Sequence, residues 1–365
     1  EYYDYYAGLA DKVEGTVLPI DKNNMQVITT RVPIGVVAAI IPWNSQMLLT
    51  AVKLAPALAM GNTVVIKSSE LAPATLFEFG KLIEKTGIPK GTINIISGFG
   101  DPCGKALTSH NLVERVAFTG GPETARHIIR NSAENLSQVS LELGGKSPVA
   151  VFEDAEQTNA LNGITAGIFG ASGQSCIAGS RLYLHTKIYD EFLKKLIEKA
   201  EKIKLGSPME EDAQMGPLNS FKQLENIEKN IKATIEQGGK IRCGGKRSSI
   251  SNKGYYFPAT IIECENHNLP VAENELFGPV WMTVDPLKIW NPPPVWLDDL
   301  IKRYCWLTII RILLDANLGV IVQFKPVSAK VVLVILTSEL VEFCTTCTIQ
   351  PPPPEGIPST GFILS

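Results

Sequence analysis

The chain has 365 residues, of which 45% are hydrophobic and 19% are charged. This length predicts two domains, and this composition excludes extended disorder for most of the chain. The net charge is -3, and lysine and arginine are scattered along the sequence, so we expect no nucleic-acid partner.

Cysteine usage and the apolar runs bear on where the protein works. Seven cysteines at irregular spacing do not form a disulfide framework, so we expect a reducing, cytoplasmic compartment. No apolar run reaches the ~20 residues that cross a bilayer, so we expect no membrane partner. The chain begins with Glu1 in a Tyr-rich segment unlike a signal or transit peptide, and we expect it to be a fragment that lacks its true N-terminus.

Strand-like and helix-like segments take turns through the first part of the chain. Residues 34–41 are continuously apolar, as in a strand that is covered on both faces. The following segments repeat the alternation: helix 45–60, strand 63–67, helix 73–86, strand 92–97, helix 102–109, strand 113–118, helix 122–133, and strands 138–143 and 147–152. The pattern predicts an α/β fold with a doubly wound parallel sheet.

A second α/β domain is expected to follow. Residues 187–204 and 221–237 have the apolar spacing of surface helices, and residues 255–262 have the composition of a strand. After Val280, proline runs at 291–294 and 351–354 interrupt the pattern, and no series of elements is expected. A proline-rich linker with a small domain, a disordered tail, and a reading-frame error or unusual splice all remain open, and we favour the last. We predict a cofactor-binding domain at residues 1–143, an incomplete catalytic domain at 144–280 and an unrecognised tail at 281–365.

Cys176 is the candidate nucleophile. It ends the sequence Phe-Gly-Ala-Ser-Gly-Gln-Ser-Cys, whose small residues allow a tight turn and an accessible thiol. A buried, inert cysteine is the alternative. Cys344 and Cys347 have the spacing of a metal-binding pair, but no second pair accompanies them, and we expect no metal.

Two polar residues stand at the ends of apolar strands. Glu142 precedes two glycines, where a partly desolvated carboxylate suits a general base, and its alternative is a turn cap or a pair with Lys146. Asn44 follows the first apolar strand, where its amide suits an oxyanion, and its alternative is a helix N-cap.

A glycine-rich turn spans Gly98, Gly100 and Gly104 between a strand and a helix. This is the setting of a pyrophosphate site at a helix N-terminus. The spacing is one residue longer than the usual dinucleotide fingerprint, so an ordinary turn remains the alternative.

These motifs together resemble the aldehyde dehydrogenase superfamily. The resemblance rests on Pro42-Trp-Asn44, Lys67-Ser-Ser-Glu70, Phe118-Thr-Gly-Gly121, the Glu142 and Cys176 motifs, and Glu275-Leu-Phe-Gly-Pro-Val280. It covers about residues 1–280 and is greatest to the hydrolytic, NAD-dependent branch that includes betaine aldehyde dehydrogenases. The family's N-terminal start and C-terminal part are not recognised.

The resemblance implies a role for each matching residue. Cys176 would be the nucleophile, Glu142 the base and Asn44 half of an oxyanion hole, in an oxidoreductase that converts an aldehyde to a carboxylic acid with NAD through a thiohemiacetal and a thioester. The cofactor-binding residues it implies are Trp43, Lys67, Glu70, Gly100, Gly104, Gly121, Glu275 and Phe277. Glu70 would favour NAD, with NADP possible. An arm at residues 15–32 resembles the family's oligomerisation element, so a homo-oligomer is expected.

The sequence also departs from the family pattern. Gly121 stands where many relatives have serine, and Ser45-Gln46 replaces a proline-containing continuation. Trp43, Phe169 and Ile177 predict an apolar wall for the substrate. The alternative to an enzyme is a truncated or frame-altered relic that binds at most a dinucleotide.

Overall fold

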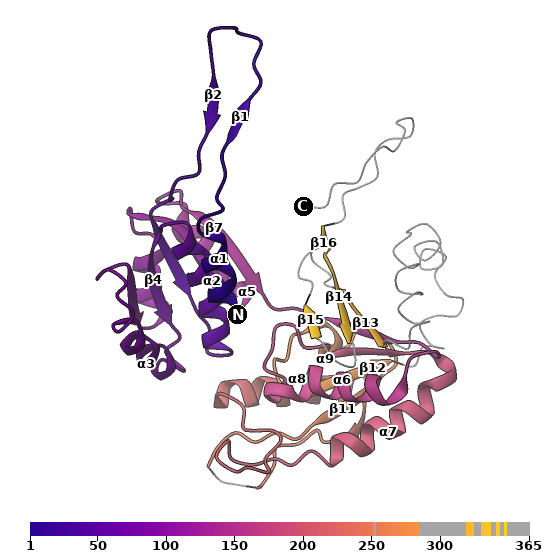
Figure 1. Cartoon of the computed structure of the whole chain (residues 1–365). Helices are drawn as coiled ribbons and strands as arrows, with labels where there is room; N and C mark the ends of the chain where they lie inside the picture. The colour runs from indigo at the N-terminus through magenta and orange to yellow at the C-terminus, as the bar shows by residue number, and fades with distance from the viewer. Residues whose placement is uncertain (251–252, 285–318, 325–329, 337–340, 344–346, 349–365) are drawn as a thin grey trace. The chain divides into compact units, whose positions relative to one another are not determined.

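The computed structural model describes residues 1–250, 253–284, 319–324, 330–336, 341–343 and 347–348 (Figure 1). The chain divides into two compact units, Glu1–Gly144 and Gly145–Ser365. Asn44 and Glu142 belong to the first unit, and Cys176 belongs to the second.

A five-stranded parallel sheet forms the centre of unit 1. Its order is β5-β4-β3-β6-β7, so the chain starts in the middle, builds toward one edge and then returns to build the other. This is the doubly wound arrangement that the alternation predicted, and the prediction is confirmed. The strands are β3 (Val36–Ile40), β4 (Thr63–Ser68), β5 (Ile93–Ser97), β6 (Val113–Gly120) and β7 (Gln138–Leu143).

Helices cover both faces of this sheet. The strand β3 is apolar at every position, so it presents apolar side chains to both faces, and each face must be buried. Val37 and Ala39 pack in one core cluster with Leu54 and Leu76, and Ala38 packs in another with Ile128. The first cluster includes α2 (Gln46–Ala59) and α3 (Ala74–Ile83), and the second includes α5 (Pro122–Ser132) with α4 (Lys105–Thr108) beside it. The helix expected over 102–109 is shorter because its first turn is a separate π-helical turn, Gly100–Gly104.

Two elements stand outside this layered arrangement. The strands β1 (Thr16–Leu18) and β2 (Val27–Thr29) pair as an antiparallel arm that projects from the rest of unit 1 (Figure 1). The arm lies within the predicted range 15–32. A further helix, α1 (Tyr2–Leu9), was not expected, and it buries none of its residues.

Unit 2 contains a second sheet, in which only the edge strand β10 is antiparallel to its neighbour. The order is β10-β11-β12-β9-β8. The strands are β8 (Pro148–Val151), β9 (Arg181–Leu184), β10 (Lys240–Cys243), β11 (Thr260–Cys264) and β12 (Val280–Val284). Core clusters on its faces include α6 (Gln157–Phe169) and α7 (Tyr189–Glu201) in one, and α8 (Phe221–Glu236) and α9 (Pro270–Glu273) in the other.

Regular structure continues past Val280, where we expected it to stop. The strand β12 runs to Val284 in the centre of its sheet. Four later segments form a separate antiparallel sheet: β13 (Gly319–Phe324), β14 (Lys330–Leu336), β15 (Val341–Phe343) and β16 (Cys347–Thr348). The expectation of no elements is therefore wrong for these segments, whose β-branched runs favour strands. The proline runs at 291–294 and 351–354 lie outside the described residues.

No helix in the described ranges is both long enough and apolar enough to cross a membrane.

Candidate active site

A strained turn carries Cys176 away from the end of α6. Ala171, Ser172 and Gly173 adopt consecutive left-handed conformations, with φ of 49°, 55° and 70°. Such values are costly for residues with a Cβ, so the surrounding contacts must hold the turn in place. Cys176 itself is half-buried, and Ile177 beside it is exposed.

Backbone contact fixes this turn against the loop that carries Glu275. A Cβ placed on Gly173 would lie 2.1 Å from the carbonyl oxygen of Gly278. No side chain fits in that space, so Gly173 must be glycine for steric reasons as well as for its φ. The Cys176 turn and the Glu275 motif, which are far apart in sequence, are therefore neighbours within unit 2.

The segment that leads into α8 holds the Cys176 turn. The Gln174 side-chain oxygen accepts a hydrogen bond from the backbone N–H of Asn219 at 2.8 Å, and the Ser172 hydroxyl donates to the carbonyl of Gly216 at 2.9 Å. These bonds anchor the two residues that precede and follow Gly173. The turn is therefore fixed by side-chain bonds as well as by backbone contact.

The first turn of α8 holds the Glu275 loop. The side-chain nitrogen of Gln223 donates to the carbonyl of Phe277 at 3.1 Å and also to the carbonyl of Leu276. Phe277 has a left-handed φ of 51°. Because Gln223 bonds to two successive carbonyls, the backbone beside Glu275 has a defined course.

A small cavity lies between these pieces of unit 2. Residues of the Cys176 turn and of the Glu275 loop line it together with the buried Lys146. Burial, and then the charge of Arg181, lower the pKa of Lys146 to about 7, although the charge of Glu275 acts in the opposite direction. The residues that line the cavity include Gly145, Lys146, Ser175, Ser180, Glu275 and Phe277.

Unit 1 brings together three of the predicted cofactor residues. Lys67 is 5% exposed, and its ammonium lies 3.7 Å from the Glu70 carboxylate. A Cβ on Gly104 would lie 3.6 Å from Lys67 Cε. The end of β4 and the glycine turn after β5 therefore form one surface, as expected for adjacent parallel strands.

Two of the other cofactor residues of unit 1, Gly100 and Gly121, have open surroundings. Neither Gly100 nor Gly121 has an atom within 4 Å of a Cβ built on it. Gly121 is the N-cap of α5 in extended conformation, with Pro122 at the first helical position. Trp43 is half-buried at the end of β3. Their cofactor-binding role stays a prediction.

Asn44 follows β3 and Glu142 lies within β7, two strands of the same sheet that are separated by β6. Helix α2 begins at Gln46 with Ser45 as its N-cap residue, so the N-cap alternative for Asn44 is not adopted. Glu142 is exposed on β7, and the expected partial desolvation is therefore wrong within the described residues. The reason is the two-residue period of the strand, which turns Leu141 and Leu143 inward and Glu142 outward.

A buried lysine that we did not single out lies near Glu142. Lys53 of α2 donates to the Thr119 hydroxyl at 2.5 Å, and Thr119 is the cross-strand partner of Glu142 in the β6–β7 register. Its signal in the sequence is a lone charge within an otherwise apolar helix.

The structure also corrects the expected substrate wall, because Phe169 is 3% exposed and packs edge-on against Trp281 in the core.

Two other thiols, those of Cys243 and Cys264, differ from Cys176 because they are buried. Burial raises the pKa of Cys243 to about 11 and that of Cys264 to about 12, so both stay protonated. Among the described residues there is no group of three potential metal ligands. Cys344 of the predicted cysteine pair lies outside them.

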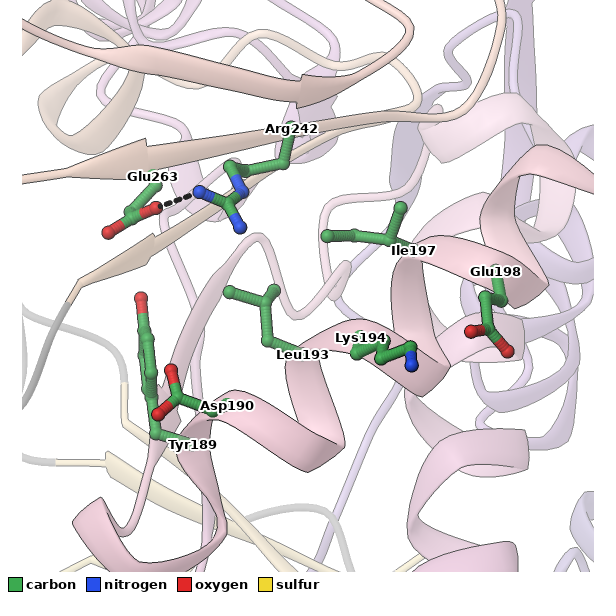
Figure 2. Close-up of a pocket in the computed structure, with 8 residues that line it drawn as sticks. All are labelled: Tyr189, Asp190, Leu193, Lys194, Ile197, Glu198, Arg242 and Glu263. Carbon is green, nitrogen blue, oxygen red and sulfur yellow. Dashed lines mark hydrogen bonds and ion pairs between the residues drawn. The ribbon is translucent and has the colours of Figure 1, made fainter.

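A more open hollow elsewhere in unit 2 holds none of the predicted site residues. Figure 2 shows it between α7 and the strands β10 and β11, where Arg242 pairs with Glu263 at 3.0 Å. Its lining combines Leu193 and Ile197 with charges of both signs. Its lining contains no cysteine, so we place the candidate thiol chemistry at Cys176.

Comparison with known proteins gives a consistent result. The Aldehyde dehydrogenase family matches residues 1–287. The chain is 54% identical over 286 residues to "(Z)-2-((N-methylformamido)methylene)-5-hydroxybutyrolactone dehydrogenase" of Acinetobacter baylyi, covering 78% of this chain and 58% of that protein. It is 44% identical to "Aldehyde dehydrogenase family 2 member B4, mitochondrial" of Arabidopsis thaliana, covering 76% of this chain and 51% of the relative.

Solved structures share the same fold. Betaine aldehyde dehydrogenase from Staphylococcus aureus in complex with NAD⁺ matches with a TM-score of 0.75 and 38% identity, covering 77% of this chain and 56% of that one. The chain thus spans between half and three fifths of the length of these relatives.

Proposed function

The chain belongs to the aldehyde dehydrogenase family, and from this membership we propose that it oxidises a small aldehyde to a carboxylic acid with NAD. The observation that carries the proposal is the fixed turn that presents Cys176 beside the Glu275 loop. We further propose that the protein works in the cytoplasm as a homo-oligomer, with the β1–β2 arm as its contact element.

The residues of unit 1 fit the adenosine half of NAD. Glu70 supplies an accessible carboxylate for ribose hydroxyls, and Lys67 lies between it and Gly104. Gly100 and Gly121 leave open space at the starts of helical turns, where backbone N–H groups favour phosphate. Glu70 would repel a 2'-phosphate, which favours NAD over NADP.

The nicotinamide half would be held by Glu275 and Phe277, with Trp43 as a further wall. When bound, NAD supplies the acceptor for the hydride that leaves the aldehyde carbon. In this proposal the Glu275 carboxylate accepts hydrogen bonds from the ribose hydroxyls. The bonds from Gln223 to the carbonyls of Leu276 and Phe277 fix the backbone beside Glu275.

The side chains account for the other bonds that form and break. The Cys176 thiolate adds to the carbonyl carbon, and the Asn44 amide donates to the oxygen that becomes negative. The hydride leaves as the carbonyl reforms as a thioester. Glu142 accepts a proton from water, the hydroxide attacks the thioester, and the Cys176 thiolate is released with the carboxylic acid. The balance is aldehyde, NAD⁺ and water to acid, NADH and a proton.

The first test compares thiols. Cys176→Ala should abolish NADH formation from small aldehydes and leave the NAD dissociation constant within about threefold, because the thiol makes the covalent bond. Cys243→Ala is the control, since that thiol is buried and protonated. Equal NADH formation by Cys176→Ala and the parent chain would exclude Cys176 as the nucleophile.

The second test separates the two half-reactions. Glu142→Gln should give a first-turnover burst of NADH followed by a stall, because the thioester forms but its hydrolysis lacks a base. A fall in burst and steady-state rates by the same factor would show that Glu142 acts before the thioester.

A second candidate function is a non-catalytic protein that binds a dinucleotide. The observation that favours it is the glycine turn of unit 1, where Lys67 lies beside Gly104 and Glu70. NADP binding as tight as NAD binding would count against the role proposed for Glu70.

A further inference from the structure

Lys146 is a buried cation close to the proposed nicotinamide end of the site. It follows Gly144-Gly145 in the connection between β7 and β8, and it is 5% exposed. Removing an ammonium from water costs several kcal/mol unless a neighbouring group compensates for the lost hydration. A lysine in this position therefore needs a physical reason.

The charges around Lys146 identify the compensating group. Arg181 at the start of β9 opposes the ammonium, and the thiol of Cys264 on β11 is protonated because burial raises its pKa to about 12. Glu275, from the loop between α9 and β12, is the carboxylate whose negative charge favours the ammonium. The attraction acts on both partners, so the cation also favours the ionised form of Glu275.

The geometry relates this pair to the proposed chemistry. Lys146 and Glu275 line one cavity together with Ser175, which precedes the nucleophile. Gln223 bonds to the carbonyls of Leu276 and Phe277 and so fixes the backbone of the loop. These bonds hold the backbone, and the charge of Lys146 acts on the carboxylate at the end of the Glu275 side chain.

We propose that Lys146 is a positioning residue, which holds the Glu275 carboxylate ionised and oriented toward the nicotinamide ribose. This inference rests on the proposed function, because it assigns the ribose to Glu275. It adds a requirement for a positive charge at residue 146, behind the carboxylate, where it does not touch the aldehyde or the hydride.

The first arm of the test measures NAD affinity by titration calorimetry on the full chain. Lys146→Met should weaken binding about tenfold near pH 6, and Lys146→Arg should retain it, because arginine keeps the charge. In the parent chain, affinity should fall as pH rises from about 6 to about 9 and the ammonium loses its proton. This fall should be absent from both variants. Lys195→Met, which removes an exposed lysine of α7, is the control and should behave as the parent does.

The second arm does not depend on NAD. In lysine-labelled protein, one lysine signal should titrate near neutral pH and be absent from Lys146→Met. In Glu275→Gln its midpoint should move down by about one pH unit, because the compensating charge is gone. An unchanged midpoint, or unchanged NAD affinity in Lys146→Met, would overturn the proposal. If no form of the chain binds NAD, the proposed function fails, while the titration still decides whether Lys146 and Glu275 are coupled.

Discussion

Two glycine-containing turns, one in each unit, use glycine for opposite purposes. In the turn that ends at Gly104, a Cβ on Gly100 meets nothing within 4 Å. In the turn that leads to Cys176, a Cβ on Gly173 would overlap the carbonyl of Gly278. The first turn leaves space open at Gly100, and the second has its space at Gly173 filled by another segment of the same unit.

This difference indicates what each turn contacts. Glycine in an open turn allows a ligand to approach the backbone, as phosphates do at helix N-termini. Glycine in a closed turn allows two backbones to pack, which places a neighbouring side chain precisely. The cofactor turn should therefore tolerate a new side chain at Gly100 without loss of folding, and the nucleophile turn should not tolerate one at Gly173.

The largest expected effect is at Gly173. Gly173→Ala should lower the free energy of unfolding by about 3 kcal/mol or more, because the new Cβ meets backbone atoms and a left-handed φ. Gly278→Ala is the matched control, since its Cβ would meet the flexible end of Ile227, and it should cost less. Urea unfolding of both variants measures the difference. Equal losses would show that the turn is not closed as described.

The pH dependence of stability should show the buried lysine. The pKa of Lys146 is about 7 in the folded chain, below its ordinary value of 10.5. The unfolded chain therefore binds more protons between these values, and stability rises with pH across this window. The contribution is about 1.4 kcal/mol per pH unit at most. Lys146→Met should remove it, and parallel curves for the two proteins would contradict the assignment.

An intermediate effect is expected at Gly100. Gly100→Val should reduce NAD affinity about tenfold, because the side chain occupies the space left for the ligand. The free energy of unfolding should change by less than about 1 kcal/mol, because nothing in the fold occupies that space. Calorimetry and urea unfolding on the same samples give both numbers. A large loss of stability with unchanged affinity would reverse the comparison.

The smallest effect is expected at Gly121. As the N-cap of α5, this position favours serine, so Gly121→Ser should raise stability by a few tenths of a kcal/mol. A small increase in the thermal midpoint, with NAD affinity retained, is the expected result. A decrease would mean that the open space at Gly121 is needed for some other contact.

The sequence was sufficient for the sheet of unit 1, whose strands all fall where strands were expected, but β9 and β12 of unit 2 were not expected. The apolar run of β3 predicted a strand covered on both faces, and the alternation predicted the winding of unit 1. Contacts between distant segments were not predictable, because nothing local in Gly173 indicates that Gly278 lies against it. The environment of single charges was also not predictable: Glu142 is exposed where burial was expected, and Lys146 is buried where it was considered only as a possible partner of Glu142.

Counting the NADH formed per chain tests the central claim most directly. The 365-residue chain is mixed with NAD and a small aldehyde in a rapid-mixing fluorimeter, beside Cys176→Ala. The account predicts at least one NADH per parent chain and none from the variant, with equal NAD binding by both. NAD binding without NADH formation by the parent chain would contradict it, and would favour the non-catalytic dinucleotide binder.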